Sequence, residues 1–185
     1  SDSFTIERGT SLAIRDFAPG ATFYGQGMAI RVDAVDFGID ESDVYTLSLC
    51  PECGYTHDSR TSDMTMRECP RCTSQGIADA GQRVPALALR KVLAMVNRDE
   101  ARISDRDDDR RQRSFEIRAL GDIDMSTAQR VWFTDGYDFG AAYLSSVAVR
   151  TVNFGARDSG RPLMASGEEV KSVGFTVCEG CGQLD

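Results

Sequence analysis

The chain contains, at residues 44–54, the stretch Val-Tyr-Thr-Leu-Ser-Leu-Cys-Pro-Glu-Cys-Gly. Its apolar residues alternate with polar ones up to the first cysteine, which predicts a half-buried strand that leads directly into a cysteine pair. A second pair follows in Cys69-Pro-Arg-Cys72, and together with Cys50 and Cys53 it fits the pattern C-x2-C-x15-C-x2-C. This is the spacing of a four-cysteine zinc ribbon.

The residues around these pairs favour metal-binding knuckles. Two residues between thiolates let one tight turn present both sulfurs to a single ion, and the intervening loop returns the chain to complete a tetrahedron. Gly54 can adopt the positive φ of such a turn, whereas Thr73 stands at the equivalent position of the second pair. We therefore predict an inserted zinc ribbon at residues 44–75, with one structural Zn²⁺ held by Cys50, Cys53, Cys69 and Cys72.

Other interpretations of the cysteines remain open at this point. A third pair, Cys178 and Cys181, ends the chain's cysteine pattern and would form a second, incomplete metal site unless the three pairs share metal in another order. Iron also accepts four thiolates, and a single pair can be a redox motif. A catalytic zinc is not favoured because the only histidine, His57, is followed by Asp58 and Ser59, which excludes the H-x-E of a zinc deaminase.

Composition predicts one globular domain over residues 1–185. The chain has 185 residues, 41% of them hydrophobic, and a formal net charge of −8. That charge disfavours a general nucleic-acid binder. No apolar run long enough for a membrane span and no secretory signal is evident, so we expect a cytoplasmic protein with no membrane partner.

Basic residues nevertheless gather in one region. Residues 83–118 hold ten of the 21 lysines and arginines. Residues 103–113 are almost entirely charged, which is compatible with a capped helix or with a solvated loop. If DNA is a partner, this is where we expect contact. The candidate nucleic-acid-binding residues are Arg98, Arg102, Arg110, Arg111 and Arg113.

The remaining pattern is mainly β with short helices (α+β), built on antiparallel sheets. Alternation predicts strands at residues 28–34, 115–119 and 173–177, and a short helix is expected near residues 12–17. Asp135-Gly136 predicts a hairpin with a type I′ turn. No phosphate-binding loop of the form G-x-x-x-x-G-K-[ST] and no G-x-S-x-G elbow is present, so we expect no enzymatic activity from this chain.

Several short segments resemble one family when taken in order. Leu12-Ala-Ile-Arg-Asp-Phe-Ala-Pro-Gly20, the acidic-then-arginine stretch 104–113 and the ending Gly174-Phe-Thr-Val-Cys-Glu-Gly-Cys-Gly182 are similar to the MrfA-like zinc-binding domain. This cysteine-rich domain occurs at the C-terminal end of superfamily-two DEAD/DEAH-box helicases and in partner proteins of the DISARM antiphage system. In that family the domain continues past the last pair with more cysteines.

The resemblance implies a non-catalytic zinc module of a DNA helicase or its partner subunit, acting in DNA repair or antiphage defence. Its partners would be helicase domains in the same or another chain. Because the sequence lacks an initial methionine and ends four residues after Cys181, we expect a fragment of a larger protein. The acidic charge favours a different function, a zinc-ribbon adaptor between proteins without nucleic-acid contact. A free-standing metalloenzyme is a third alternative.

Overall fold

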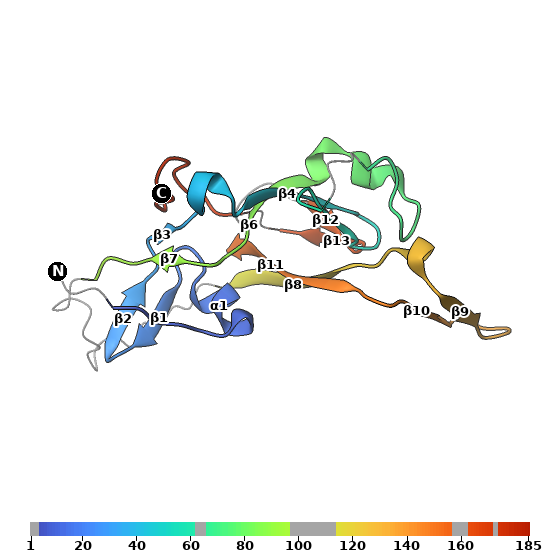
Figure 1. Cartoon of the computed structure of the whole chain (residues 1–185), viewed down its shortest axis with the longest axis horizontal. Helices are drawn as coiled ribbons and strands as arrows, with labels where there is room; N and C mark the ends of the chain where they lie inside the picture. Colours follow the sequence, from blue (N-terminus) through green and yellow to red (C-terminus); the bar gives the residue numbers. More distant parts are fainter. Residues whose placement is uncertain (1–3, 62–65, 97–113, 157–162, 172–173) are drawn as a thin grey trace.

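Antiparallel strand pairs dominate the structure. The computed structural model describes residues 4–61, 66–96, 114–156, 163–171 and 174–185. Within these ranges every strand pair is antiparallel, and the single α-helix is α1 (Thr10–Asp16). The strands form five two-stranded sheets and one three-stranded sheet (Figure 1). The predicted mainly β architecture and the short N-terminal helix are confirmed.

The N-terminal part is a small hairpin with its own apolar cluster. Strands β1 (Thr22–Gly25) and β2 (Met28–Arg31) are joined by a two-residue turn in which both residues have positive φ. Ile30 and Val32 are buried with Phe23, whose ring meets Phe17 edge-on with ring centroids 5.0 Å apart. The predicted alternation is therefore correct, but the strand ends at Arg31 and resumes as β3 (Ala34–Val35), which pairs with β7 (Val92–Leu93).

The three-stranded sheet links the cysteine-rich segment to the main core. Strand β4 (Val44–Leu49) is the strand that the alternating stretch before Cys50 predicts, and it lies between β5 (Thr56–Asp58) and β6 (Arg83–Leu87). Four 3₁₀ turns complete the connections: η1 (Ile39–Glu41), η2 (Gln75–Ala78), η3 (Ala80–Gln82) and η4 (Met125–Thr127). The buried core that β4 enters consists of Leu47, Leu49, Leu120, Phe154, Leu163, Ala165 and Val170.

A long hairpin extends from this core. Strands β8 (Phe115–Asp122) and β11 (Ala148–Ala156) pair along the body, and β9 (Arg130–Phe133) and β10 (Gly140–Tyr143) continue the ribbon away from it (Figure 1). The hairpin is confirmed, but its predicted type I′ turn is wrong. Only Gly136 of the Asp135-Gly136 pair has a positive φ. The Thr134 N–H donates to Phe139 O at 2.9 Å, which closes a wider loop.

The C-terminal region contains a second short hairpin, β12 (Leu163–Ala165) with β13 (Glu168–Val170). The strand predicted at residues 173–177 is wrong over its described part. Gly174 has a φ of +87° and donates its N–H to Phe154 O, and only Val177 forms a single bridge, to Leu184. A positive φ is incompatible with a continuous strand. The charged segment 103–113 lies outside the described residues.

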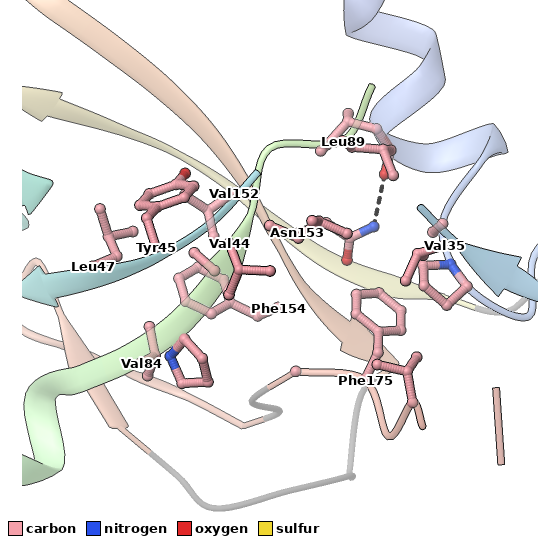
Figure 2. Close-up of a pocket in the computed structure, with 18 of the residues that line it drawn as sticks. Val35, Val44, Tyr45, Leu47, Val84, Leu89, Val152, Asn153, Phe154 and Phe175 are labelled. Atoms are coloured by element: carbon pink, nitrogen blue, oxygen red, sulfur yellow. Dashed lines mark hydrogen bonds between the residues drawn. The ribbon is translucent and has the colours of Figure 1, made fainter. Parts of the chain in front are cut away.

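An apolar pocket of about 360 Å³ lies between β4, β6 and β11. Tyr45, Val152 and Phe175 are among its walls (Figure 2), and the Asn153 side chain beside it donates to Ile14 O at 2.8 Å. None of its described lining residues is acidic, basic, histidine or cysteine. The pocket therefore offers apolar contact and no charged catalytic group. Among the described residues, no helix has both the length and the hydropathy needed to cross a bilayer.

Candidate metal centre

The structure brings the first two cysteine pairs together. The Sγ atoms of Cys50, Cys53, Cys69 and Cys72 all lie within 4.8 Å of one another. Cys50 Sγ and Cys72 Sγ are 3.6 Å apart, and Cys53 Sγ and Cys69 Sγ are 3.5 Å apart. Four thiolates at the usual Zn–S distance of about 2.3 Å form a tetrahedron with edges of about 3.8 Å. The separations are far longer than an S–S bond, so the four thiols fit a tetrahedral metal ion and no disulfide.

Each pair sits in a turn with the same backbone hydrogen bonds. In the first turn, the Cys50 N–H donates to Tyr55 O at 2.8 Å and the Gly54 N–H donates to Cys50 O at 3.1 Å. In the second, the Cys69 N–H donates to Ser74 O and the Thr73 N–H donates to Cys69 O, both at 2.8 Å. These bonds direct both thiols of a pair to the same side of the turn. Both knuckles therefore share one backbone conformation.

The fifth residue of each knuckle has a left-handed conformation. Gly54 has a φ of +72° and Thr73 a φ of +62°. Glycine accepts this conformation without steric cost, whereas a β-branched residue does not. The sequence thus predicts the left-handed conformation of Gly54 correctly. Thr73 adopts the same conformation although its β-branched side chain disfavours a positive φ.

The thiols differ in their surroundings. Cys50 and Cys69 are fully buried, Cys53 is half-buried and Cys72 is exposed. Burial raises the pKa of the Cys53 and Cys69 thiols. For Cys72, burial acts in the same direction, but the Ser74 N–H and the neighbouring thiols outweigh it and lower the pKa. A cluster that buries thiols against one another favours a cation, because metal binding displaces their protons and a divalent ion offsets half of the charge of the four thiolates.

The first knuckle is docked onto distant parts of the chain. The Gly167 N–H, in the β12–β13 turn, donates to Pro51 O at 2.7 Å. The buried Gln82 side chain donates to Leu49 O at 3.1 Å and to Met164 O at 2.7 Å. The Arg71 guanidinium, from the second knuckle, donates to Cys53 O at 2.9 Å. These contacts fix the metal centre to the core, and sequence patterns gave no signal for Gln82 or Gly167.

The third pair forms the same kind of turn at another place. The Cys178 N–H donates to Gln183 O at 2.7 Å, the Gly182 N–H donates to Cys178 O at 2.8 Å, and Gly182 has a φ of +71°. Both thiols are exposed and do not belong to the four-cysteine group. The backbone N–H of Cys181 lowers the pKa of the Cys178 thiol. Cys178 and Cys181 thus have knuckle geometry, with no other histidine, cysteine or acidic residues gathered into a metal-binding group around them in the described part of the chain.

The other predicted residues are placed as follows. His57 lies on β5 opposite Ser48 of β4 and is not part of the thiol group. The five candidate DNA-binding residues, Arg98, Arg102, Arg110, Arg111 and Arg113, lie outside the described residues. Their expected role therefore stays a prediction.

The chain was compared with protein families, curated proteins and solved structures. No protein-family model, no curated protein and no solved structure matches the chain.

Proposed function

We propose that the four-cysteine group binds one Zn²⁺ as a structural zinc ribbon. The observation that carries this proposal is the approach of four thiols from two matching knuckles to within 4.8 Å of one another. The ion would cross-link the two knuckles and add to the hydrogen bond from Arg71 to Cys53 O and to the buried contact between Cys50 and Cys69. Because four protein thiolates fill a tetrahedral zinc completely, no position is left for water or substrate, so the proposed zinc would be structural and not catalytic.

Elemental analysis of the purified chain tests the metal. We expect one zinc per chain, and loss of that zinc in Cys50→Ser and Cys72→Ser, which remove ligands from different knuckles. His57→Ala is the matched control and should keep the full metal content. A purified chain without metal, or one loaded with iron after expression in ordinary medium, would contradict the proposal.

We further propose that this module acts in the cytoplasm, supporting a DNA helicase or its partner subunit in DNA repair or antiphage defence. The ordered resemblance to the MrfA-like zinc-binding domain supports this function, and helicase domains in the same or a partner chain are the expected partners. The arginine-rich segment 98–113 would contact DNA. Reading the coding sequence on both sides of this chain tests the partnership, since helicase motifs should appear there or in an adjacent gene.

Salt-dependent DNA binding tests the nucleic-acid contact. In fluorescence anisotropy with a labelled duplex DNA of about 30 base pairs, affinity should fall steeply between about 50 and 200 mM salt, with a log–log slope of about 0.9 per phosphate contacted. A triple variant, Arg110→Ala with Arg111→Ala and Arg113→Ala, should flatten that slope. Replacing three exposed arginines elsewhere, Arg31, Arg67 and Arg130, by alanine is the control.

The second candidate function is a protein–protein adaptor without nucleic-acid contact. The net charge of −8 favours it, because an acidic surface repels phosphate. The same anisotropy experiment separates the two functions: absence of DNA binding even at 50 mM salt favours the adaptor.

We also propose that Cys178 and Cys181 supply half of a second zinc site, with the other ligands outside the described residues. Their backbone bonds and the positive φ of Gly182 match those of the first two knuckles. A chain extended by any coding sequence found downstream of Asp185 should hold two zinc ions and fall to one in Cys178→Ser. A stoichiometry that stays at one in the longer chain would contradict this half-site.

A further inference from the structure

The end of the long hairpin, which we call the arm (residues 129–143), exposes an unusual amount of aromatic surface. Five of the chain's fifteen aromatic residues lie within these fifteen positions. Phe133, Tyr137 and Phe139 are 84%, 77% and 70% exposed, and Trp132 and Tyr143 are more than half exposed. Large apolar surfaces of this kind on a soluble protein mark interaction sites.

The strand register explains why these rings are uncovered. Trp132 faces Ala141 across the ribbon, and Phe133 faces Gly140. Small residues on β10 thus stand opposite the large rings of β9, and a Cβ at Gly140 would lie 2.9 Å from Cδ1 of Phe133. Because side chains alternate along a strand, Phe133 lies on one face and Trp132 on the other. Both faces of the ribbon are therefore apolar.

The arm also has unpaired edges. Among the described residues, β9 and β10 pair only with each other, so each strand offers an outer edge for hydrogen bonding. A two-stranded ribbon is marginally stable by itself and gains from a third strand. The usual protections of an exposed edge, lysine or proline, are absent from residues 129–143. Addition of a strand from another molecule would satisfy the edge and cover one aromatic face.

The charges of the arm favour some kinds of binding partner over others. Its distal loop carries Asp135 and Asp138, both exposed, and its only basic residue, Arg130, lies at the base. Single-stranded nucleic acid needs a positive groove beside the stacking rings, and an anionic bilayer needs basic residues. A second copy of the chain would bring like-charged tips together. The tip is complementary instead to a partner with basic residues beside apolar ones.

We propose that the arm docks an extended segment of a partner protein in which apolar and basic residues alternate. The segment adds to the free edge of β9 or β10, its apolar side chains cover the rings, and its lysines or arginines reach Asp135 and Asp138. This inference rests on the arm alone and holds whether the chain serves a helicase or acts as an adaptor.

A library of random twelve-residue peptides displayed on phage tests the proposal on the purified zinc-loaded chain. Selected peptides should combine large apolar residues with lysine or arginine. The arm variant Phe133→Ser with Phe139→Ser should weaken their binding at least tenfold in fluorescence anisotropy. The control variant Ile39→Ser with Met95→Ser removes equally exposed apolar side chains, 85% and 91% exposed, and should bind normally.

The charge contribution is measured separately. Asp135→Asn with Asp138→Asn should weaken peptide binding and remove most of its salt dependence between 50 and 300 mM. Zinc content and circular dichroism should be unchanged in every variant, since all the substituted residues are exposed. These readouts keep a loss of binding distinct from a loss of fold.

Four outcomes would overturn the proposal. The first is a screen that enriches no peptide sensitive to the arm variant, and the second is enrichment of acidic peptides. The third is sedimentation showing a dimer that dissociates in the arm variant, which would make a second copy the occupant. The fourth is arm-dependent binding to phosphatidylglycerol vesicles or to a 20-nucleotide single-stranded DNA.

Discussion

Thr73 is the residue at which local sequence and required geometry disagree most clearly. Its φ of +62° belongs to the left-handed region, which costs a non-glycine residue about 1–2 kcal/mol. Thr73→Gly should therefore raise the free energy of unfolding of the zinc-loaded chain by about 1 kcal/mol, after the larger entropy of glycine in the unfolded chain is subtracted. Urea unfolding measures this, and Gly54→Thr, which also brings a Cβ against Ser166, should act in the opposite direction.

Asp58 gives a second prediction, in pH dependence. Hydrogen bonds from Arg60, at 2.9 Å from its N–H and 2.7 Å from its guanidinium, lower the pKa of this buried carboxyl below its ordinary value of 3.8, and Arg150 lies 3.0 Å away. A lowered pKa in the folded state means stabilisation that is present above pH 3.8 and lost as the pH falls through the folded value. Asp58→Asn should cost about 2 kcal/mol at pH 7.

Urea unfolding of the wild type and of Asp58→Asn over a range of pH tests this predicted pH dependence. The difference between wild type and Asp58→Asn should shrink as the pH falls below 3.8. Asp79→Asn replaces an exposed carboxylate and keeps its capping oxygen, so it is the control and should differ little from wild type in stability at pH 7. A constant difference over the whole range would show that Asp58 stabilises through shape and not through charge.

At the scale of elements, the metal centre and the main core are separate clusters. Cys50 and Cys69 pack with Tyr55 and Ile77, whereas the main core is formed by residues of β4, β8, β11, β12 and β13. Chelation of zinc should therefore unfold the two knuckles and leave the β8–β11 pair protected. Hydrogen exchange with and without EDTA measures this, with fast exchange expected at residues 50–77. Uniform loss of protection would contradict it.

Patterns within one element were readable from the sequence, and contacts between elements were not. The alternating stretch before Cys50, the x15 spacing and the glycine of the first knuckle are local features, and each corresponds to what the structure contains. The strand expected at 173–177 failed because Gly174 gives its N–H to Phe154, a partner 20 residues away. The Asp135-Gly136 pair predicted the hairpin of the arm, but the sequence did not predict that its five aromatic side chains would be exposed.

At the scale of the molecule, Gln82 joins β4 to β12, two strands that are far apart in the sequence. It donates to Leu49 O and Met164 O, and its own side-chain oxygen accepts from the Met164 N–H at 3.3 Å. Gln82→Ala leaves the buried Leu49 carbonyl and the partly buried Met164 carbonyl without these donors and should lower the free energy of unfolding by about 2–3 kcal/mol. Thermal unfolding measures the loss, and the exposed Gln129→Ala should change it little.

The connection between Gln82 and Met164 also has a consequence for synthesis on the ribosome. All four metal ligands have been made once residue 72 is joined, but Leu163 and Val170 of the core follow only about 90 residues later. At 5–20 residues per second this interval lasts about 5–20 s. The knuckles can take up zinc on the nascent chain during that time, while Leu47 and Leu49 on the adjoining strand still lack their partners. With the proposed zinc bound at that stage, the growing chain would pass through an intermediate whose metal site is complete while Leu47 and Leu49 are still exposed.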